Sequence, residues 1–212
     1  LGGTVTVVSM GPPQADVALR EALAMGCDEA YLVSAREFGG SDTYATSGII
    51  AAALKKIGYD LIITGRQAID GDTAQVGPQI AEKLHLPQVS YVEEVVEAAA
   101  DHVVVKRQFE DGYHIIKIKT PCLLTAIAEL ATPRYMSVRG IVEAYEKEIK
   151  VLGFEDLKDG LELDMIGLKG SPTNVYQSFT KEVKGAGTIL EGLSADEAVK
   201  AIMDKLEAKF II

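Results

Sequence analysis

Apolar and polar residues follow one another along the first half of the chain in a way that predicts strands and helices in turn. The apolar runs are short and rich in Val, Ile and Leu rather than alternating, which is typical of parallel strands buried on both faces. The stretches between them carry apolar residues at helical spacing. The predicted strands are residues 5–8, 30–33 and 60–64, and the predicted helices are residues 14–25, 43–57 and 72–84. Helices between parallel strands make right-handed crossovers, so we expect a doubly wound α/β sheet.

After the third helical stretch, apolar and polar positions alternate, which indicates strands with one exposed face. Residues 102–107 and 113–119 flank the pair Asp111-Gly112, and an Asp-Gly pair between such segments predicts a β-hairpin. Residues 92–96 predict a further strand before the hairpin, and the apolar run 123–127 predicts one after it.

The sequence beyond residue 131 loses regular periodicity until its last helix. Glycines are frequent and apolar stretches are short, which is typical of an arm that packs against another protein. Ser194 and Glu197 have the spacing of a capping box, at the start of a helix whose apolar face carries Ile202 and Leu206. We therefore expect an α/β body followed by a C-terminal arm.

Composition and charge exclude several classes of protein. The chain has 212 residues, 48% of them hydrophobic, so it can bury the core of an α/β domain. Its 31 acidic residues against 21 basic ones give a net charge of −10, which argues against a nucleic-acid partner. We find no apolar run long enough for a membrane span and no leader, so we expect a cytoplasmic protein. The start at Leu1, without an initiator Met, favours a fragment.

Residues that usually carry hydrolytic or metal chemistry are scattered. Cys27 and Cys122 lie in apolar stretches without a neighbouring His or second Cys, so we expect buried thiols rather than a redox or metal site. His85, His102 and His114 do not pair with a nucleophile in the sequence. We expect neither a metal site nor a hydrolase triad.

Ligands of open parallel sheets bind beyond the carboxyl ends of the strands, which points to three loops. These are residues 9–13, 38–43 and 65–78. The third is the most informative, because it joins Arg66 and several glycines to the start of a helix. Helix N-terminal amides favour a phosphate, Arg66 adds a positive charge, and Asp70 can accept hydrogen bonds from ribose hydroxyls. The loop fits neither the G-x-G-x-x-G nor the Walker pattern.

Two of these loops also have a plainer interpretation as helix caps. In the third loop, a cap formed by Asp70 or Asp72 is about as well supported as a ligand site. In the second loop, residues 39–43 offer amides and hydroxyls to a ligand, but a cap formed by Ser41 or Asp42 is favoured.

Residues 65–78, with the sequence Gly-Arg-Gln-Ala-Ile-Asp-Gly-Asp-Thr-Ala-Gln-Val-Gly-Pro, resemble the nucleotide-binding segment of electron-transferring flavoprotein β subunits. Further similar stretches occur in family order at residues 9–12, 22–26, 40–43 and 133–135, so the resemblance covers essentially the whole chain. The family's first strand, with its following loop and helix, has no counterpart here, in agreement with the abrupt start.

The resemblance implies a doubly wound, mostly parallel α/β sheet of the adenine-nucleotide-binding type, with an added β-hairpin and a C-terminal arm. It implies a heterodimer in which the α subunit holds a redox FAD and the β subunit binds a nucleotide without substrate chemistry of its own. The expected cofactor contacts are Met10, Gly65, Arg66, Gln67, Ala68, Ile69, Asp70, Gly71, Asp72, Thr73, Ala74, Gln75 and Val76. No catalytic residue and no metal ligand is expected in this chain.

Two positions resemble the two-flavin, electron-bifurcating type found in many anaerobic bacteria rather than the mitochondrial type that binds AMP. Arg66 stands where Lys is usual in the mitochondrial type, and Gly71 stands where an acidic residue is usual. The guanidinium of Arg66 can donate two parallel hydrogen bonds to a phosphate, and Gly71 removes a negative charge near it. Both changes favour a pyrophosphate, so we expect FAD rather than AMP. In the two-flavin type, NADH delivers a hydride to the β-subunit flavin. One electron then passes to a ferredoxin or flavodoxin, and the other passes through the α-subunit FAD to an acyl-CoA dehydrogenase-like partner.

Residues 130–139 resemble the loop through which the family recognises its dehydrogenase. Val138 takes the place of the apolar anchor, where better-known members have Leu, and Arg134 and Tyr135 precede it. Because Val has one methylene fewer than Leu, burial of the anchor should contribute about 0.8 kcal/mol less to binding of the dehydrogenase. The alternative is that Val138 begins a short core-packed helix over residues 138–145.

The expected division is a nucleotide-binding domain at residues 1–130, a partner-recognition loop and helix at 131–150, and an arm at 151–212 that packs on the α subunit. Two alternatives stay open. One is a non-bifurcating β subunit with structural AMP. The other is a standalone adenine-nucleotide-binding regulatory domain, against which the long arm argues.

Overall fold

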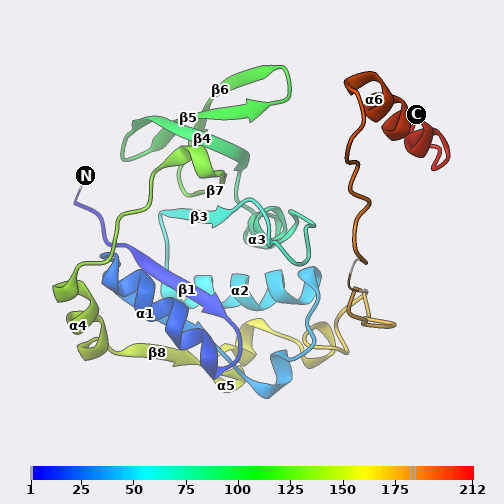
Figure 1. The fold of residues 1–212 in the computed structure, drawn as a ribbon. Coiled ribbons are helices and arrows are strands. Elements are labelled where there is room, and N and C mark those ends of the chain that lie inside the picture. The colour runs from blue at the N-terminus through cyan, green and yellow to red at the C-terminus, as the bar shows by residue number, and fades with distance from the viewer. Residues whose placement is uncertain (1, 182, 184) are drawn as a thin grey trace. The chain divides into compact units, whose positions relative to one another are not determined.

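The computed structural model describes residues 2–181, 183 and 185–212, and the chain divides into two compact units. The first unit ends at Asn174, and the second comprises Val175–Ile212. The first unit contains two open sheets with helices packed on their faces (Figure 1). Short 3-10 helices lie in its connections, at Pro13–Ala15, Arg36–Phe38, Ala128–Leu130, Lys158–Gly160 and Leu163–Met165.

The first sheet is parallel and has the strand order β1-β2-β8. Its strands are β1 (Thr6–Met10), β2 (Glu29–Val33) and β8 (Ile149–Leu152). The helices on one face are α1 (Asp16–Ala24) and α4 (Val138–Glu146), and those on the other are α2 (Thr43–Ile57) and α5 (Phe154–Leu157). Helices on both faces of a parallel sheet confirm the predicted doubly wound α/β class.

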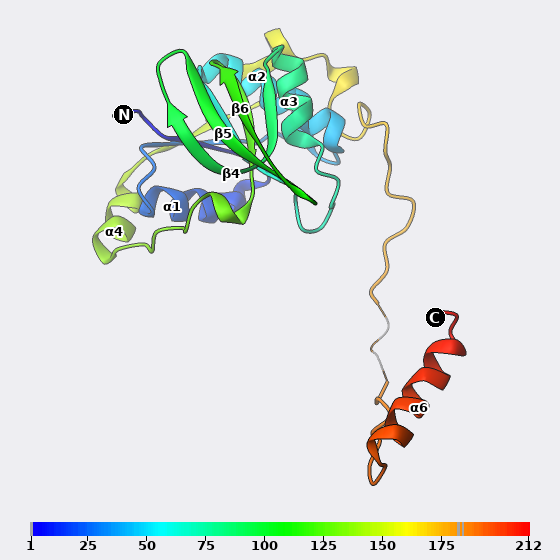
Figure 2. The ribbon, with the colours of Figure 1, turned by 90° about the horizontal axis from the view of Figure 1, so that it is seen from above.

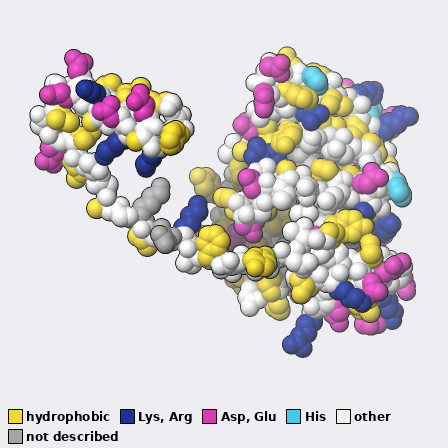
Figure 3. All heavy atoms as spheres, turned by 90° about the vertical axis from the view of Figure 1, so that its right-hand side faces the viewer, with side chains coloured by type: hydrophobic (Ala, Val, Ile, Leu, Met, Phe, Trp, Pro, Cys, Tyr) yellow, Lys and Arg dark blue, Asp and Glu magenta, His cyan; other side chains and the backbone are white. Residues whose placement is uncertain are grey.

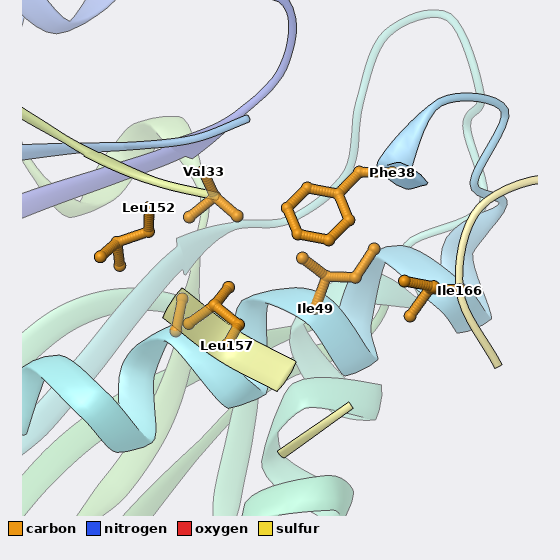
Figure 4. Close-up of a cluster of buried hydrophobic side chains, with 7 residues drawn as sticks. Val33, Phe38, Ile49, Leu152, Leu157 and Ile166 are labelled. Atoms are coloured by element: carbon orange, nitrogen blue, oxygen red, sulfur yellow. The ribbon is translucent and has the colours of Figure 1, made fainter. Parts of the chain in front are cut away.

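The side chains of β2 alternate between the two faces of this sheet, as the period of a strand requires. Ala30 and Leu32 pack against Leu19 and Leu23 of α1. Val33 points to the opposite face, toward α2 (Figure 4). The buried cluster on that face consists of Val33, Phe38, Ile49, Ala53, Leu152, Leu157 and Ile166.

This cluster includes a segment that the sequence assigned to the arm. Leu152, Leu157 and Ile166 are all buried in this cluster with the side chains of α2. They are buried although the segment that carries them is rich in turn-forming residues. Residues 151–174 therefore pack in the first unit, and the boundary between the units lies later than the sequence suggested. A few apolar side chains cover the face of α2 here without any regular periodicity that sequence reasoning can recognise.

The second sheet has five strands in the order β3-β7-β4-β5-β6. Its elements are β3 (Leu61–Gly65), β4 (Gln88–Ala98), β5 (His102–Phe109), β6 (Gly112–Lys119) and β7 (Cys122–Ala126), with α3 (Val76–Leu84) following β3. β7 pairs in parallel with both β3 and β4, whereas β4, β5 and β6 pair antiparallel. The predicted hairpin is confirmed, and the strand after it returns to the parallel part of the sheet.

α2 contributes to the cores of both sheets. Ile49 and Ala53 belong to the cluster against β2 and β8, whereas Ala51 and Leu54 pack with Ile62 of β3 and with α3. The two sets of side chains lie on different faces of one continuous helix, which holds the sheets together.

The two sheets are not paired to each other, because β1 and β3 each stand at the end of their own sheet. A groove of about 700 Å³ lies between them, lined by Thr6 and Val8 on one side and by Leu61 and Ile63 on the other. Leu61 and Ile63 are 37% and 55% exposed, so the expectation that this strand is buried on both faces is wrong. An apolar strand is buried on both faces only where neighbouring elements also cover its edge.

The second unit contains α6 (Ala195–Glu207). Its predicted capping box is confirmed: Ser194 Oγ accepts from the Glu197 amide at 3.4 Å, and Glu197 Oε2 accepts from the Ser194 amide at 2.8 Å. Val199, Ile202 and Met203 of this helix are all exposed, and hydrophobic side chains are visible on the surface of this unit in Figure 3.

Candidate functional site

The loop of residues 65–76 leaves the carboxyl end of β3 and leads into α3. The Asp72 amide donates to the Ala68 carbonyl at 3.1 Å, which closes a turn. Asp72 and Ala74 have left-handed backbones, with φ angles of 50° and 53°, and such residues cannot continue a right-handed helix. α3 therefore begins at Val76, and the prediction of a helix from residue 72 is wrong at its start.

The first turn of α3 has no side-chain cap. Gln75 occupies the N-cap position and forms no capping hydrogen bond. Asp70 Oδ1 instead accepts from the Gly71 amide at 2.9 Å, and Asp72 Oδ1 accepts from the side chain of Gln67. The interpretation of either aspartate as the helix cap is therefore wrong. Since the first amides of a helix have no partner inside it, α3 presents uncapped donors at the positive end of its dipole.

Arg66 provides a positive charge in the same loop. Its Nε donates to Gln67 Oε1 at 3.1 Å, and its guanidinium carbon lies 5.8 Å from the centre of the Tyr91 ring. Both contacts are to neutral groups, and within the described part of the chain Arg66 forms no ion pair. A cation in the loop that leads to uncapped helix amides suits a phosphate or pyrophosphate.

Tyr91 and the tip of the β5–β6 hairpin also reach this loop, which sequence reasoning missed. Tyr91 lies in a β4 bulge with a left-handed φ of 59°, and its amide donates to Thr125 Oγ1 at 3.1 Å. Arg66 and Tyr91 line a cavity of about 640 Å³ with Arg107–Asp111 at the hairpin tip. Figure 2 shows this tip beside the loop that follows β3.

No local sequence signal could have brought these residues together. The Asp111-Gly112 pair predicts the hairpin, but the bulge at Tyr91 and the twist of the sheet decide which loop its tip overhangs. Gln108 at the same tip lines a second cavity, of about 550 Å³, together with Arg66 and Gln67.

Met10 lies elsewhere along the same edge of the fold. It ends β1 and lines a cavity of about 690 Å³ with the loop after β2, including Gly40 and Ser41. The residues that line this cavity include none of the 65–76 loop. A hydrogen bond of 3.0 Å from Thr43 Oγ1 to Gln75 Oε1 joins the two regions. The structure therefore places the two predicted contact regions at separate cavities rather than at a common one.

The loop before α2 confirms the favoured cap interpretation. Asp42 Oδ1 accepts from the amides of Tyr44 and Ala45, at 2.9 and 3.0 Å. Burial disfavours the charged form of Asp42, but the amides of Ala45, Thr173 and Tyr44 outweigh it and hold the pKa of this carboxyl below its ordinary value. Ser41 is not the cap, because its Oγ donates to the Phe38 carbonyl at 2.8 Å.

The recognition segment lies around α4. This helix forms as expected after its cap Ser137, but Val138 is 82% exposed, so the interpretation of Val138 as a core residue is wrong. Ala144 is the residue of α4 that is buried, against α1. Arg134 and Tyr135 line a cavity of about 280 Å³ next to α4, and the Tyr135 ring is fully exposed. A docking role for these residues stays a prediction.

The two cysteines differ in burial. Cys122 is fully buried, as predicted, whereas Cys27 is only partly buried. Burial raises the pKa of both thiols, which favours their neutral form. Within the described part of the chain, no group of three or more His, Cys, Asp or Glu side chains is placed to hold a metal ion. Among the helices described, none combines the length and the apolar character that crossing a membrane requires.

Comparison with known proteins gives a consistent result. Residues 1–157 match the family described as the electron transfer flavoprotein domain. The chain is 55% identical over 217 residues to the acryloyl-CoA reductase electron transfer subunit gamma of Anaerotignum propionicum. It is 54% identical over 213 residues to the electron transfer flavoprotein subunit beta of Thermoanaerobacterium thermosaccharolyticum.

A third relative is the caffeyl-CoA reductase-Etf complex subunit CarD of Acetobacterium woodii, with 51% identity over 212 residues. All three alignments cover 100% of this chain and 80% of the relative. The family match and these identities agree with the resemblance at residues 65–78. The chain therefore belongs to the electron transfer flavoprotein family, as one of its β subunits.

Proposed function

We propose that this chain binds FAD at the loop of residues 65–76 and serves a bifurcating electron transfer flavoprotein in the cytoplasm of an anaerobic bacterium. The observation that supports this most directly is the combination of the uncapped start of α3 with Arg66, whose described contacts are to the neutral groups of Gln67 and Tyr91. A protein with a net charge of −10 has no general attraction for phosphates, so local donors must hold them.

The residues of this loop fit the adenylate and pyrophosphate part of such a cofactor. The amides of Val76 and Gly77 at the start of α3 would bind one phosphate, because both precede Gln79, whose amide donates to the Gln75 carbonyl at 3.0 Å as the first hydrogen bond of the helix. The guanidinium group of Arg66 would bind two oxygens of the second phosphate. Asp70 keeps its second carboxylate oxygen for a ribose hydroxyl, because Oδ1 is occupied by the Gly71 amide. FAD, when bound, supplies the two-electron and one-electron redox chemistry that side chains lack.

The proposed electron route begins with NADH as hydride donor and ends at two acceptors. One is a ferredoxin or flavodoxin, and the other is an acyl-CoA dehydrogenase-like protein reached through the FAD of an α subunit. Relatives named as subunits of acryloyl-CoA reductase and caffeyl-CoA reductase complexes support a partner that acts on acyl-CoA compounds.

A substitution at Gly71 tests whether this loop binds FAD or AMP. A Cβ added at Gly71 meets no atom within 4 Å, so Gly71→Asp adds a negative charge without a clash. Gly71→Asn has nearly the same shape without the charge and is the matched control. After co-expression with an α subunit, we expect two flavins per heterodimer in the parent and in Gly71→Asn, and a loss of the β-side flavin in Gly71→Asp.

The outcomes of this experiment separate the alternatives. A full-length heterodimer that contains one flavin and one AMP would exclude the bifurcating version and support structural AMP. Unchanged flavin stoichiometry in Gly71→Asp would exclude the role assigned to the loop. NADH oxidation by the parent heterodimer, with reduction of a ferredoxin or flavodoxin, tests the proposed donor and acceptor directly.

We also propose that the second unit binds the α subunit. The exposed apolar side chains of α6, among them Val199, Ile202 and Met203, are suited to burial against a partner. The full-length chain alone is then expected to self-associate in size-exclusion chromatography and to elute as a heterodimer when the α subunit is present. A stable, well-folded monomer would instead support a standalone regulatory domain.

A third proposal concerns Val138 as the anchor for the dehydrogenase. Val138→Asp should weaken binding of an acyl-CoA dehydrogenase-like partner at least tenfold, because the exposed anchor would then carry a charge into the interface. Val17→Asp is the control, because Val17 is a similarly exposed valine on α1. Equal affinities for both variants, measured by surface plasmon resonance, would exclude this role for Val138.

A further inference from the structure

We propose that Asp42 is a positioning residue that couples the nucleotide loop of residues 65–76 to residues 171–174, where the first unit ends. The inference rests on the proposed nucleotide site. It assigns to Asp42 a role beyond capping α2, namely that nucleotide occupancy changes how firmly the chain is held just before it enters the second unit.

The carboxylate of Asp42 serves two segments at once. Oδ1 accepts from the first amides of α2, Tyr44 and Ala45. Oδ2 accepts from the Thr173 amide at 2.9 Å, and the Asp42 amide donates to Ser171 Oγ at 2.8 Å. One residue therefore ties the start of a helix to a segment that lies 131 positions later in the sequence.

The contacts of Ser171 show that this later segment is held in a defined position. It is only 6% exposed, and its Oγ lies 2.6 Å from the Gly167 carbonyl and 3.3 Å from the Gly40 carbonyl. The Gly167 amide donates in turn to Ser41 Oγ at 3.1 Å. A buried hydroxyl with several partners indicates a specific contact rather than an accidental one.

The other side of Asp42 leads to the nucleotide loop. Its chain neighbour Thr43 donates to Gln75 Oε1 at 3.0 Å, and Gln75 is the N-cap residue of α3. One turn further along the same two helices, Ser47 Oγ and Gln79 Oε1 lie 3.0 Å apart. The start of α3 is thus connected to Thr173 through Gln75, Thr43 and Asp42, by two hydrogen bonds and one peptide bond.

A ligand at the start of α3 should reach Thr173 through this connection. A bound phosphate orders Gln75, and an ordered Gln75 holds Thr43 and Asp42 in the geometry that accepts the Thr173 amide. The entropy cost of ordering Gln75, Thr43 and Asp42 is then shared between nucleotide binding and the Thr173 contact, which couples the two sites. Because such coupling is reciprocal, loosening the Thr173 contact must also weaken nucleotide binding.

Asp42→Asn separates this role from helix capping. Asparagine caps helices about as well as aspartate, so its carbonyl oxygen can keep the contacts to α2. Its amide nitrogen then replaces the acceptor of the Thr173 amide with a donor. Asp28→Asn is the matched control, because Asp28 Oδ2 accepts a single backbone amide, that of Val5, at 2.8 Å elsewhere in the same unit.

The experiment measures hydrogen exchange of the Thr173 amide in the full chain co-expressed with an α subunit and freed of β-side flavin, with and without AMP. AMP is used because it is the part that AMP and FAD have in common. We expect saturating AMP to slow exchange at Thr173 at least threefold in the parent and in Asp28→Asn. In Asp42→Asn, we expect at least tenfold faster exchange at Thr173, no response to AMP, and two- to fivefold weaker AMP binding by calorimetry.

If the contact were purely structural, its loss in Asp42→Asn would still change the basal exchange rate at Thr173. The exchange rate in the parent would then not respond to AMP. AMP binding to the parent without any change at Thr173 overturns the coupling and leaves the proposed nucleotide site intact. The same AMP response in Asp42→Asn as in the parent overturns the role of Asp42. Failure of the parent to bind AMP or FAD overturns the proposed site and the coupling together. The comparison within the parent protein does not depend on how well the variants fold.

Discussion

Replacing Gly167 with Ala should destabilise the first unit by about 2–5 kcal/mol. Gly167 has a left-handed φ of 60°, and a Cβ added there would lie 2.2 Å from the Glu37 carbonyl oxygen and 3.3 Å from the Gly39 carbonyl oxygen. Both neighbours are backbone atoms and cannot rotate away. The segment that carries Ile166 and Ser171 must therefore shift off the loop before α2.

The magnitude follows from two separate costs. A left-handed backbone disfavours Ala by roughly 1–2 kcal/mol relative to Gly. Forcing a methyl group into a packed contact typically costs about 1–3 kcal/mol. For a chain of this length, about 1 kcal/mol lowers the melting temperature by roughly 2–4 °C, so we expect a decrease of at least about 4 °C.

Thermal unfolding of the full chain, followed by circular dichroism and by calorimetry, measures this decrease. Gly112→Ala is the control, because its Cβ would meet no atom within 4 Å and its φ is not left-handed, so it should change stability by less than about 1 kcal/mol. Gly167→Asn separates the two costs, since Asn tolerates the left-handed region but carries the same Cβ. Stability of Gly167→Asn equal to that of the parent would refute the close-contact reasoning.

Three further predictions concern the core, a cap and acid stability. Ile49→Ala should lower the free energy of unfolding in urea by about 2–5 kcal/mol, because Ile49 is fully buried (Figure 4). Ile63→Ala is the control and should cost under about 1 kcal/mol, because Ile63 is exposed. Similar losses in the two variants would contradict the assigned core. Ser137→Ala should destabilise α4 by about 1 kcal/mol, seen as faster hydrogen exchange, because Ser137 Oγ accepts from the Gly140 amide at 2.9 Å; unchanged exchange would contradict the cap. The lowered pKa of Asp42 means that its ionised form stabilises the fold above about pH 4, and that this stabilisation is lost as the pH falls through the lower folded pKa. The stability difference between the parent and Asp42→Asn should therefore shrink below about pH 4 in a urea titration at several pH values, and a difference independent of pH would contradict the assignment.

Local patterns in the sequence predicted the elements whose signals are contained within themselves. The helix predicted at residues 43–57 coincides with α2, and the caps at Asp42 and Ser194 follow from short-range hydrogen bonding. The family and the site loop could likewise be proposed from residues 65–78 alone. These features depend on neighbours within a few positions, where side-chain chemistry determines the backbone.

Features that depend on distant residues could not be predicted in this way. The exposure of Leu61 and Ile63 depends on which elements cover β3, and the sequence of an apolar strand does not reveal whether its neighbours cover it. The packing of Leu157 and Ile166 against α2 involves irregular segments without periodicity. Tyr91 reaches Arg66 because a bulge changes the direction of its side chain, and no residue type announces a bulge with certainty.

The position of α2 between two separate cores has a consequence for how the first unit unfolds. Two cores built from different side chains could open independently, each with its own free energy. Because Ile49 and Ala53 serve one core while Ala51 and Leu54 serve the other, loss of α2 exposes both cores at the same time. Cooperativity between the two cores therefore depends on this helix of 15 residues together with Val8 of β1, which packs against both cores, and the slowest-exchanging amides of both sheets should report the same opening event.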